Sequence, residues 1–333
     1  MRRMYRLFRF ALSAVPAFLA ACSAEGSLPE EVAVPLEFCA GGDALLSSSV
    51  TRVGTLPEAA FDATVVLAMR QGEYSRLSGR YEGGHAVSVG TDGGVSWQLQ
   101  PDAAQPVYPE TGDWLYAVAV SPKATPDAVG NVSYTLTGKE DLLYAPEIRG
   151  NKWEGDRFSG NKVPGRDKPL EFAHLLTRLQ FKACKRQAGG LAVTIKSVKV
   201  NEALPEVSVP LATGEPSFGG TAGLTLRPGD GGAGKEVPAG GTAVALGDLL
   251  LPPLSALSAE SGYTLDVETS IGVFTSIPIV FSGGDAALPA EKLQAGMSHE
   301  ITFYISDSSL GVLSVTATPW DAVNVDDDLE LVP

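Results

Sequence analysis

The sequence predicts an all-β protein of the sandwich class. Glycine (37 residues) and proline (23 residues) are frequent in this chain of 333 residues, and short runs rich in threonine, valine and tyrosine lie between them. Several of these runs alternate apolar and polar residues, which is the pattern of a strand with one face in a core and the other in water. Helical periodicity is scarce, so stacked sheets rather than helical layers are expected.

Individual runs of the sequence support this prediction. The run "WLYAVAV" (residues 114 to 120) is apolar throughout and predicts a central strand covered on both faces. The run "EFAHLLTRLQF" could form three helical turns, but its end alternates, so a strand is favoured there. Four further runs alternate and predict half-buried strands: "VSYTL" (132–136), "LAVTIKS" (191–197), "GYTLDVET" (262–269) and "EITFYIS" (300–306).

The start of the chain predicts a lipoprotein signal peptide over residues 1–21, followed by a tether over 22–32. Four arginines precede an apolar run that ends at Ala21 and is too short to cross a bilayer as a helix. The residues Leu19-Ala20-Ala21-Cys22 resemble a bacterial lipobox, which implies that Cys22 is lipidated and that the cut falls just before it. Ser23, rather than an aspartate, follows and favours export to the outer membrane. An ordinary signal peptide that contains a cysteine is the alternative.

The charge of the chain argues against binding to nucleic acid. The net charge is −14, and removal of the four arginines in residues 1–21 changes it to about −18. An acidic surface repels phosphate backbones and anionic lipid headgroups. The cysteines that remain after Cys22 are Cys39 and Cys184, and their distance in sequence leaves both a disulfide and two buried thiols open.

About 310 residues remain after processing, which suggests two domains of ordinary size. The predicted boundary is the stretch 151–169, because residues 149 to 169 carry six basic and three acidic residues and few aliphatic ones. It separates an N-terminal β-sandwich (33–150) from a C-terminal β-sandwich with an acidic tail (170–333). A solvated linker or exposed loop is expected there. A protease-sensitive hinge at Arg149, Arg157 or Arg166 is the alternative.

No catalytic residues, metal ligands or cofactor site are predicted. The histidines are His85, His174 and His299, and none has metal-ligand spacing to another histidine or to a cysteine. His299 is expected at the exposed start of a strand, and His174 is expected to be half-buried in one. No nucleophile elbow or paired carboxylates are present, so an enzyme is not expected.

Several landmarks occur in an order that resembles the fimbrillin family, the subunits and accessory subunits of type V fimbriae of Bacteroidia. Each landmark is loose, and their order and spacing over nearly the whole processed chain carry the resemblance. They are "VPLEFCAGG", "TRVGTLPEAAFDATVVLAM", "GDWLYAVAVSP", "EDLLYAPEIRG", "LEFAHLLTRLQFK", "DLLLPPLSAL", "LQAGMSHEITFYI" and "VTATPWDAV".

The resemblance implies a fold and a route of assembly. The fold would be two transthyretin-like β-sandwich domains in tandem. The precursor would reach the outer membrane and cell surface as a lipoprotein. An Arg-specific protease would then remove the first strand together with the lipid. The vacated groove would accept a strand from another fimbrial subunit, in a homo- or hetero-polymer.

Residues of this chain match parts of that route. Residues 33 to 40 place Val34, Leu36 and Phe38 on one face, as a displaceable strand requires. Arg52 follows a serine-rich stretch and is the expected cut site, with a surface arginine of no consequence as the alternative. The donor strand candidate in the tail presents Val323, Val325, Leu329 and Leu331 on one face. Asp327 interrupts this face, so a terminal subunit at the tip or anchor is also open.

A second function stays open, namely a surface lipoprotein that never polymerises and binds a host or glycan ligand. Sugars stack on exposed tryptophans, and the chain has Trp97, Trp114, Trp153 and Trp320. Trp114 and Trp320 lie in strand-like contexts and are expected in the core. Trp153 is the expected exposed platform.

Overall fold

The computed structural model describes residues 33–41, 60–75, 81, 83–158, 160, 168–185, 191–253, 263–279, 293–306 and 310–319. Strands dominate this part of the chain, and its helical structure includes the short 3-10 turns η2 (Glu154–Asp156) and η4 (Asp230–Gly232). The all-β prediction is confirmed. Over the same residues, no helix has the length and apolar character needed to cross a membrane.

The contacts of the chain hold Val34–Pro333 together as one compact unit. A division of this unit into two domains at 151–169 stays a prediction. Within the unit, sheets formed from the first half of the chain and sheets formed from the second half can be described in turn.

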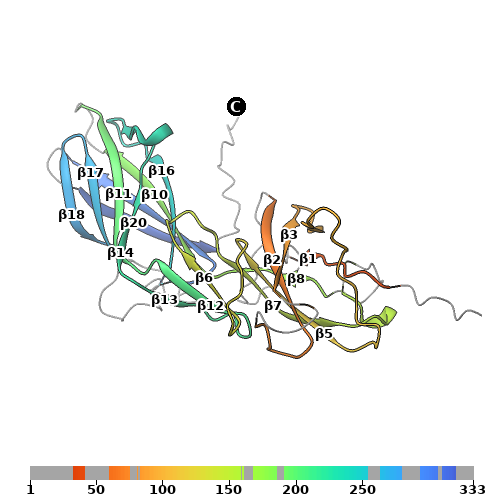
Figure 1. The fold of residues 1–333 in the computed structure, drawn as a ribbon. Helices are drawn as coiled ribbons and strands as arrows, with labels where there is room; N and C mark the ends of the chain where they lie inside the picture. Colours follow the sequence, from red (N-terminus) through yellow and green to blue (C-terminus); the bar gives the residue numbers. More distant parts are fainter. Residues whose placement is uncertain are drawn as a thin grey trace, which may run out of the picture. The chain divides into compact units, whose positions relative to one another are not determined.

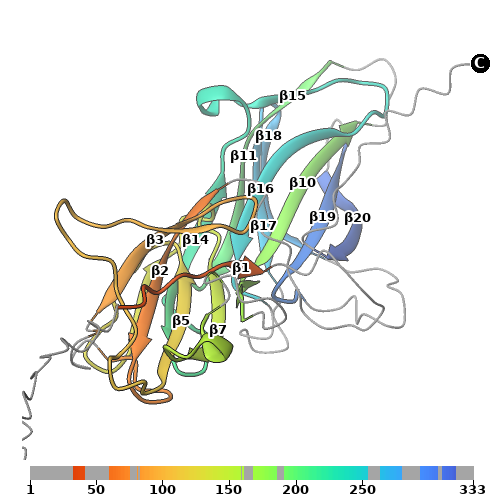
Figure 2. The ribbon, with the colours of Figure 1, turned by 90° about the vertical axis from the view of Figure 1, so that its right-hand side faces the viewer.

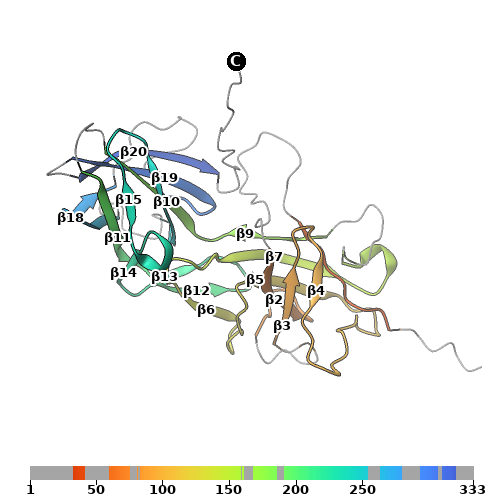
Figure 3. The ribbon, with the colours of Figure 1, turned by 90° about the horizontal axis from the view of Figure 1, so that it is seen from above.

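The largest sheet has six strands and comes mostly from the first half of the chain (Figure 3). Its strand order is β4 (Val95–Trp97), β3 (Gly84–Val89), β2 (Phe61–Ala68), β5 (Leu115–Ser121), β7 (Leu143–Gly150) and β9 (Ala173–His174). All neighbours in this sheet are antiparallel. β5 is buried along nearly all its length between β2 and β7, as the apolar run predicted.

Two small sheets complete the first half of the chain. β1 (Ala40–Gly41) pairs in parallel with β8 (Leu170–Glu171), and the two strands lie side by side in Figure 1. A three-stranded sheet joins the two halves of the sequence, because β6 (Asn131–Thr135) pairs with β12 (Glu206–Pro210), which pairs with β13 (Ser217–Gly219).

The second half forms two further sheets. One has the order β16 (Val244–Leu251), β10 (Thr177–Lys185), β19 (Met297–Ile305) and β20 (Leu310–Pro319), which can be followed from left to right in Figure 2. The other has the order β14 (Ala222–Leu226), β11 (Val193–Ala203), β17 (Thr264–Thr269) and β18 (Gly272–Pro278), and β15 (Lys235–Val237) also pairs with β11. Each of the six runs described above as predicted strands contributes residues to these sheets.

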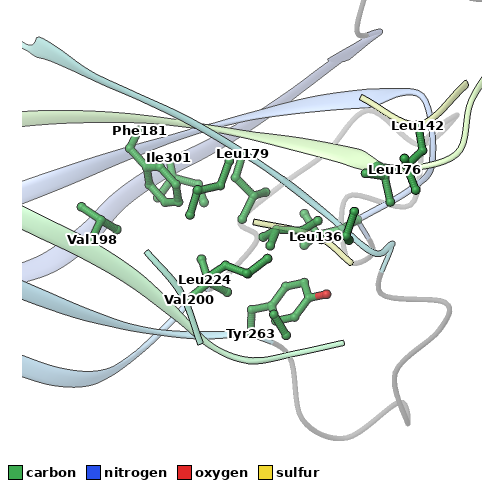
Figure 4. Close-up of a cluster of buried hydrophobic side chains, with 14 of the residues drawn as sticks. Leu136, Leu142, Leu176, Leu179, Phe181, Val198, Val200, Leu224, Tyr263 and Ile301 are labelled. Carbon is green, nitrogen blue, oxygen red and sulfur yellow. The ribbon is translucent and has the colours of Figure 1, made fainter. Parts of the chain in front are cut away.

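Two clusters of buried apolar side chains hold the sheets together. The larger cluster contains Leu179, Phe181 and Ile301 from one C-terminal sheet and Val198 and Val200 from the other, so these sheets face each other as a sandwich (Figure 4). The rings of Phe181 and Phe303 stack at 5.8 Å. The smaller cluster, which we call the N-terminal core, lies on one face of the six-stranded sheet.

The six-stranded sheet is covered on both faces. Ala63, Val65 and Leu67 of β2 belong to the N-terminal core. Val66 and Ala68 of the same strand belong to the larger cluster, as the alternation of a strand requires. The N-terminal core therefore depends on whatever covers its side of this sheet.

His299 does not lie where the sequence placed it. It is 1% exposed within β19, which has a neighbour on each side, instead of at an exposed strand start. Burial disfavours the charged imidazolium and lowers the pKa of His299 to about 4. His174 is a strand residue as expected, but it is buried more deeply than expected, and its Nδ1 lies 2.8 Å from a carboxylate oxygen of Asp141.

The buried His299 predicts a loss of stability in acid. The unfolded chain takes up a proton near pH 6.5, whereas the folded chain resists it until about pH 4, so stability falls as the pH drops through this window. Between pH 7 and pH 5 this group should remove about 2 kcal/mol from the free energy of unfolding. Urea titrations at both pH values should show that loss in the wild type and a loss smaller by this amount in His299→Gln. Equal losses in the two proteins would contradict the assignment.

Candidate functional site

The candidate site is the place where residues 34–41, here called the N-terminal segment, cross the N-terminal core. Val34, Leu36 and Phe38 of the predicted displaceable strand all belong to this segment. The other predicted site residues lie outside the described residues: Cys22, Arg52, Val323, Val325, Leu329 and Leu331. The structure therefore shows how residues 34–41 lie on the N-terminal core.

One edge of the N-terminal segment pairs with loops that flank the six-stranded sheet. The Leu36 N–H donates to Pro106 O (2.8 Å), and Val34 O accepts from the Tyr108 N–H (2.9 Å). Further along, the Ala40 N–H donates to Gly93 O (2.8 Å). The first two hydrogen bonds flank the antiparallel bridge between Pro35 and Val107, and the third flanks the antiparallel bridge between Cys39 and Gly94.

The end of the segment also pairs on its other edge. Cys39 O accepts from the Leu170 N–H (2.9 Å), and Ala40 pairs in parallel register with Leu170 in the β1–β8 sheet. These main-chain bonds on two sides do not depend on which side chains the extended segment carries. This is the type of pairing that a second extended segment can reproduce.

Side chains of the segment alternate between the core and the outside. Leu36 (0% exposed), Phe38 (3%) and Ala40 (8%) are members of the N-terminal core, and Val34 packs against it. Glu37, between two of them, is exposed. Burial of a large apolar side chain contributes about 1.5–3 kcal/mol, so Leu36 and Phe38 are the main apolar anchors.

Phe38 sits in an aromatic pocket. Its ring lies 4.5 Å from the ring of Phe158 and 5.7 Å from that of Trp97, measured between centroids. Tyr108 stacks on Phe158 at 5.6 Å, and its hydroxyl accepts a hydrogen bond from the Phe158 N–H (2.6 Å). Burial raises the pKa of Tyr108, so this phenol stays neutral. The pocket is thus assembled from three separate parts of the chain.

Polar groups also fix the backbone of the segment. Leu36 O accepts hydrogen bonds from Trp97 Nε1 (2.9 Å) and from Gln105 Nε2 (2.7 Å). Both donors are side chains, so this carbonyl is held although the segment crosses the core outside the large sheet. Trp97 therefore contributes both a ring to the Phe38 pocket and a hydrogen bond to the backbone.

The chain passes very close to the segment at Gly160. A Cβ placed on residue 160 would lie 2.4 Å from the carbonyl carbon of Glu37 and from the nitrogen of Phe38. Real side chains do not approach main-chain atoms so closely, so glycine is required here for the close backbone approach. Phe158 and Gly160 therefore both lie against the middle of the segment.

Sequence reasoning did not single out several residues of this site. Ala40 has the same parity as Leu36 and Phe38, so the alternation could have added it. Trp97, Phe158 and Gly160 come from a short strand and from the stretch interpreted as a linker, and no local pattern links them to the segment. In that stretch, Phe158 is fully buried, whereas Arg149 is exposed and Arg157 is half-buried; Arg166 lies outside the described residues.

A second feature is a surface cleft of about 510 Å³ beside β7 and β8. Its lining includes Trp114, whose ring has the guanidinium carbon of Arg149 at 4.7 Å and the Lys168 Nζ at 5.6 Å. Trp114 is half-buried before β5, so its placement in the core was wrong: cation–π contacts hold it at the surface. Trp153 is 57% exposed, as expected, and Trp320 lies outside the described residues.

The described residues define an all-β protein whose N-terminal core is covered by an extended segment near the start of the chain. A model of the fimbrillin-like family matches residues 51–320, so the chain belongs to this family. The family prediction made from the sequence landmarks is confirmed. The matched range begins after the N-terminal segment.

Solved structures share the fold. A candidate cell adhesion protein from Bacteroides uniformis has a TM-score of 0.54 at 16% identity, and the match covers 88% of this chain and 100% of that one. Another from Bacteroides ovatus has a TM-score of 0.55 at 13% identity, with 87% and 98% covered. No curated protein matches the sequence.

The Phe38 pocket predicts a sharp difference between neighbouring positions of the segment. Phe38→Ala removes a buried ring and should lower the free energy of unfolding by about 3–5 kcal/mol. Glu37→Ala changes an exposed side chain and should stay within about 0.5 kcal/mol of the wild type. Urea unfolding, with amide hydrogen exchange at residues 34–41, would measure both effects. A Phe38→Ala protein as stable as Glu37→Ala would show that the segment does not close this core in solution.

Proposed function

We propose that this protein is a structural and adhesive subunit of a cell-surface fimbrium. It is exported as an outer-membrane lipoprotein precursor and assembled when a protease cut allows the N-terminal segment to be exchanged for a strand of another subunit. Family membership supports the fimbrial class. The exchange step rests on the way residues 34–41 are held.

The observation that carries the proposal is the noncovalent seating of the N-terminal segment. Main-chain hydrogen bonds on two edges, and the buried Leu36 and Phe38, fix it on the core. In sequence, only residues 42–60 connect it to β2, and Arg52 lies in this connection. One cut there leaves every contact described above in place but removes the covalent link.

That change is enough to make the segment exchangeable. A covalent link holds a segment at an effective concentration on the order of millimolar. After the cut, a free segment in a micromolar solution has a concentration roughly 1,000-fold lower than this effective concentration. The difference corresponds to about 4 kcal/mol of binding free energy that the tether no longer supplies. A strand on a neighbouring subunit that makes equal contacts can then compete. Before the cut it cannot, which prevents premature assembly.

The lipid anchor and the partners follow from the same route. Cys22 would carry the acyl chains that hold the precursor at the membrane, since each buried CH₂ contributes about 0.8 kcal/mol. The partners would be other fimbrial subunits and an Arg-specific protease. The route requires no catalytic residue, and the described residues contain no group of three or more potential metal ligands.

A second candidate is a non-polymerising surface lipoprotein that binds a host or glycan ligand. The exposed Trp153 favours it, because an aromatic ring in solvent can stack on a sugar. The cleft that includes Trp114 adds a concave surface with both acidic and basic side chains nearby. This candidate shares the export route but does not need strand exchange.

Cleavage at Arg52 should trigger assembly. Limited digestion of the processed precursor with an Arg-specific protease should give a ladder of SDS-resistant multimers on a gel of unboiled samples. Arg52→Ala should abolish the ladder, because the segment stays tethered. Arg70→Ala is the matched control, since Arg70 is an exposed arginine outside the segment and should leave the ladder intact.

The digest also separates the two candidates. Cleavage at Arg52 without multimers would favour the non-polymerising protein. A full ladder from Arg52→Ala would show that the cut site is wrong.

Lipidation at Cys22 can be tested by metabolic labelling with palmitate. The wild type should carry the label and sediment with outer membranes, and Cys22→Ser should lose both properties. Cys39→Ser is the control, because this half-buried cysteine in the N-terminal segment should not affect lipidation. Equal labelling of the Cys22→Ser protein would disprove the assignment.

A further inference from the structure

We infer that the groove under the N-terminal segment selects strands with an aliphatic residue, an aromatic residue and a small residue at alternate positions, and that it rejects this chain's own tail. The strand that fills it would then come from a different subunit. This inference rests on the proposed strand exchange and adds a rule for the partner. The rule follows from the surroundings of Leu36, Phe38 and Ala40.

The middle position requires a ring. Phe38 is enclosed by the rings of Phe158 and Trp97. Trp97 Nε1 donates a hydrogen bond to Leu36 O of the bound strand, and the main-chain N–H of Phe158 donates to the Tyr108 hydroxyl. Such surroundings relax only partly around a smaller side chain, so replacement of the ring leaves a cavity. A strand with an aliphatic residue at this position would lose much of its free energy of binding to the N-terminal core.

The last position requires a small residue. Ala40 is 8% exposed and lies in register with Leu170, which is fully buried. The next residue is equally confined, because a Cβ on Gly41 would lie 3.0 Å from two side-chain carbons of Pro169. A long side chain in this narrow part would have to displace β8 from the core.

The first position suits an aliphatic side chain. Leu36 is fully buried within the N-terminal core, and its carbonyl is held by two side-chain donors. Val34 precedes it and packs against the same core. The segment thus presents four alternate positions in the order Val34, Leu36, Phe38 and Ala40, all of them apolar.

The tail, residues 321 to 333 ("DAVNVDDDLELVP"), does not supply this pattern. It contains no aromatic residue. Every set of four alternate positions within it includes at least one acid: Asp321 or Asp327 in one parity, and Asp326, Asp328 or Glu330 in the other. The same sets occur when the tail is read backwards, so strand direction does not change the result.

An acid at any of these positions would be placed in an apolar core. The cluster under the groove consists of aliphatic and aromatic side chains. A carboxylate without a partner in such surroundings is strongly disfavoured, or must take up a proton first. The lack of a ring and the presence of a charge therefore act together against self-assembly through this tail.

The test uses the full chain with a site-specific protease sequence inserted between residues 42 and 59. After cleavage, fluorescent peptides are added, and their binding is followed by anisotropy, with release of the original segment measured by mass spectrometry. The peptide of residues 33–41 should bind, and the same peptide with Phe38→Ala should bind at least 100-fold more weakly. The tail peptide 321–333 should show no saturable binding.

A redesigned tail gives the matched control. The double substitution Asp327→Phe and Leu329→Ala converts Val323, Val325, Asp327 and Leu329 into the order valine, valine, phenylalanine, alanine, which follows the segment except that valine stands in place of leucine. This peptide should bind, whereas Asp327→Asn alone removes the charge, supplies no ring and should stay weak.

The outcomes separate the inference from the proposed function. If the 33–41 peptide does not bind and the original segment does not leave, strand exchange itself is wrong. If the 33–41 peptide binds and the unmodified tail binds within tenfold of it, exchange stands and the selection rule is overturned. Weak binding of the redesigned tail, alongside tight binding of the 33–41 peptide, would also overturn the rule.

Discussion

The structure depends on one constraint: the apolar face of the six-stranded sheet that carries the N-terminal core must be covered by something other than a second large sheet. In the C-terminal sandwich, two sheets of comparable size bury each other's faces. On the N-terminal core, part of the cover is the β1–β8 pair and the extended residues before it. Because this part of the cover is so short, we expect that it can leave the core without unfolding of the large sheet.

The other face of the six-stranded sheet packs independently of the N-terminal segment. Side chains on the opposite face of β2 and β5 join the larger cluster, together with residues of the second half of the chain. Tyr144 illustrates the link, since its hydroxyl donates a hydrogen bond to Leu211 O (2.8 Å). Loss of the N-terminal segment would therefore remove contacts from one face of the six-stranded sheet only.

Period-two alternation predicted much of this fold because it reflects local geometry. It identified β6, β11, β17 and β19, and it placed Leu36 and Phe38 on one face, whereas β5 was predicted from a run that is apolar throughout. His299 shows that the alternation also predicts burial at a position where we expected exposure. Its parity is that of Ile301 and Phe303, which point into the core, and a polar residue type was given more weight than its position.

The parts that could not be predicted depend on contacts between distant residues. Phe158 and Gly160 lie in a stretch rich in charge and glycine, whose composition is typical of an exposed loop. Their role follows only from the approach of that stretch to residues 37 and 38, more than 100 positions earlier in the sequence. The prediction that Trp114 lies in the core was wrong for a related reason, because its cationic neighbours come from β7 and from the stretch before β8.

The position of Gly160 also bears on the rate of exchange. It touches the backbone at the middle of the segment, so a strand that displaces the segment from either end reaches the same obstacle. The hydrogen bonds at the two ends can break one at a time, each at a net cost of about 1 kcal/mol. At residues 37 and 38 the segment also has the backbone of Gly160 against it, so we expect this contact to open only when Gly160 moves as well. We therefore expect that the contacts of Leu36 and Phe38 determine which strand is bound, whereas movement of Gly160 determines how fast one strand replaces another.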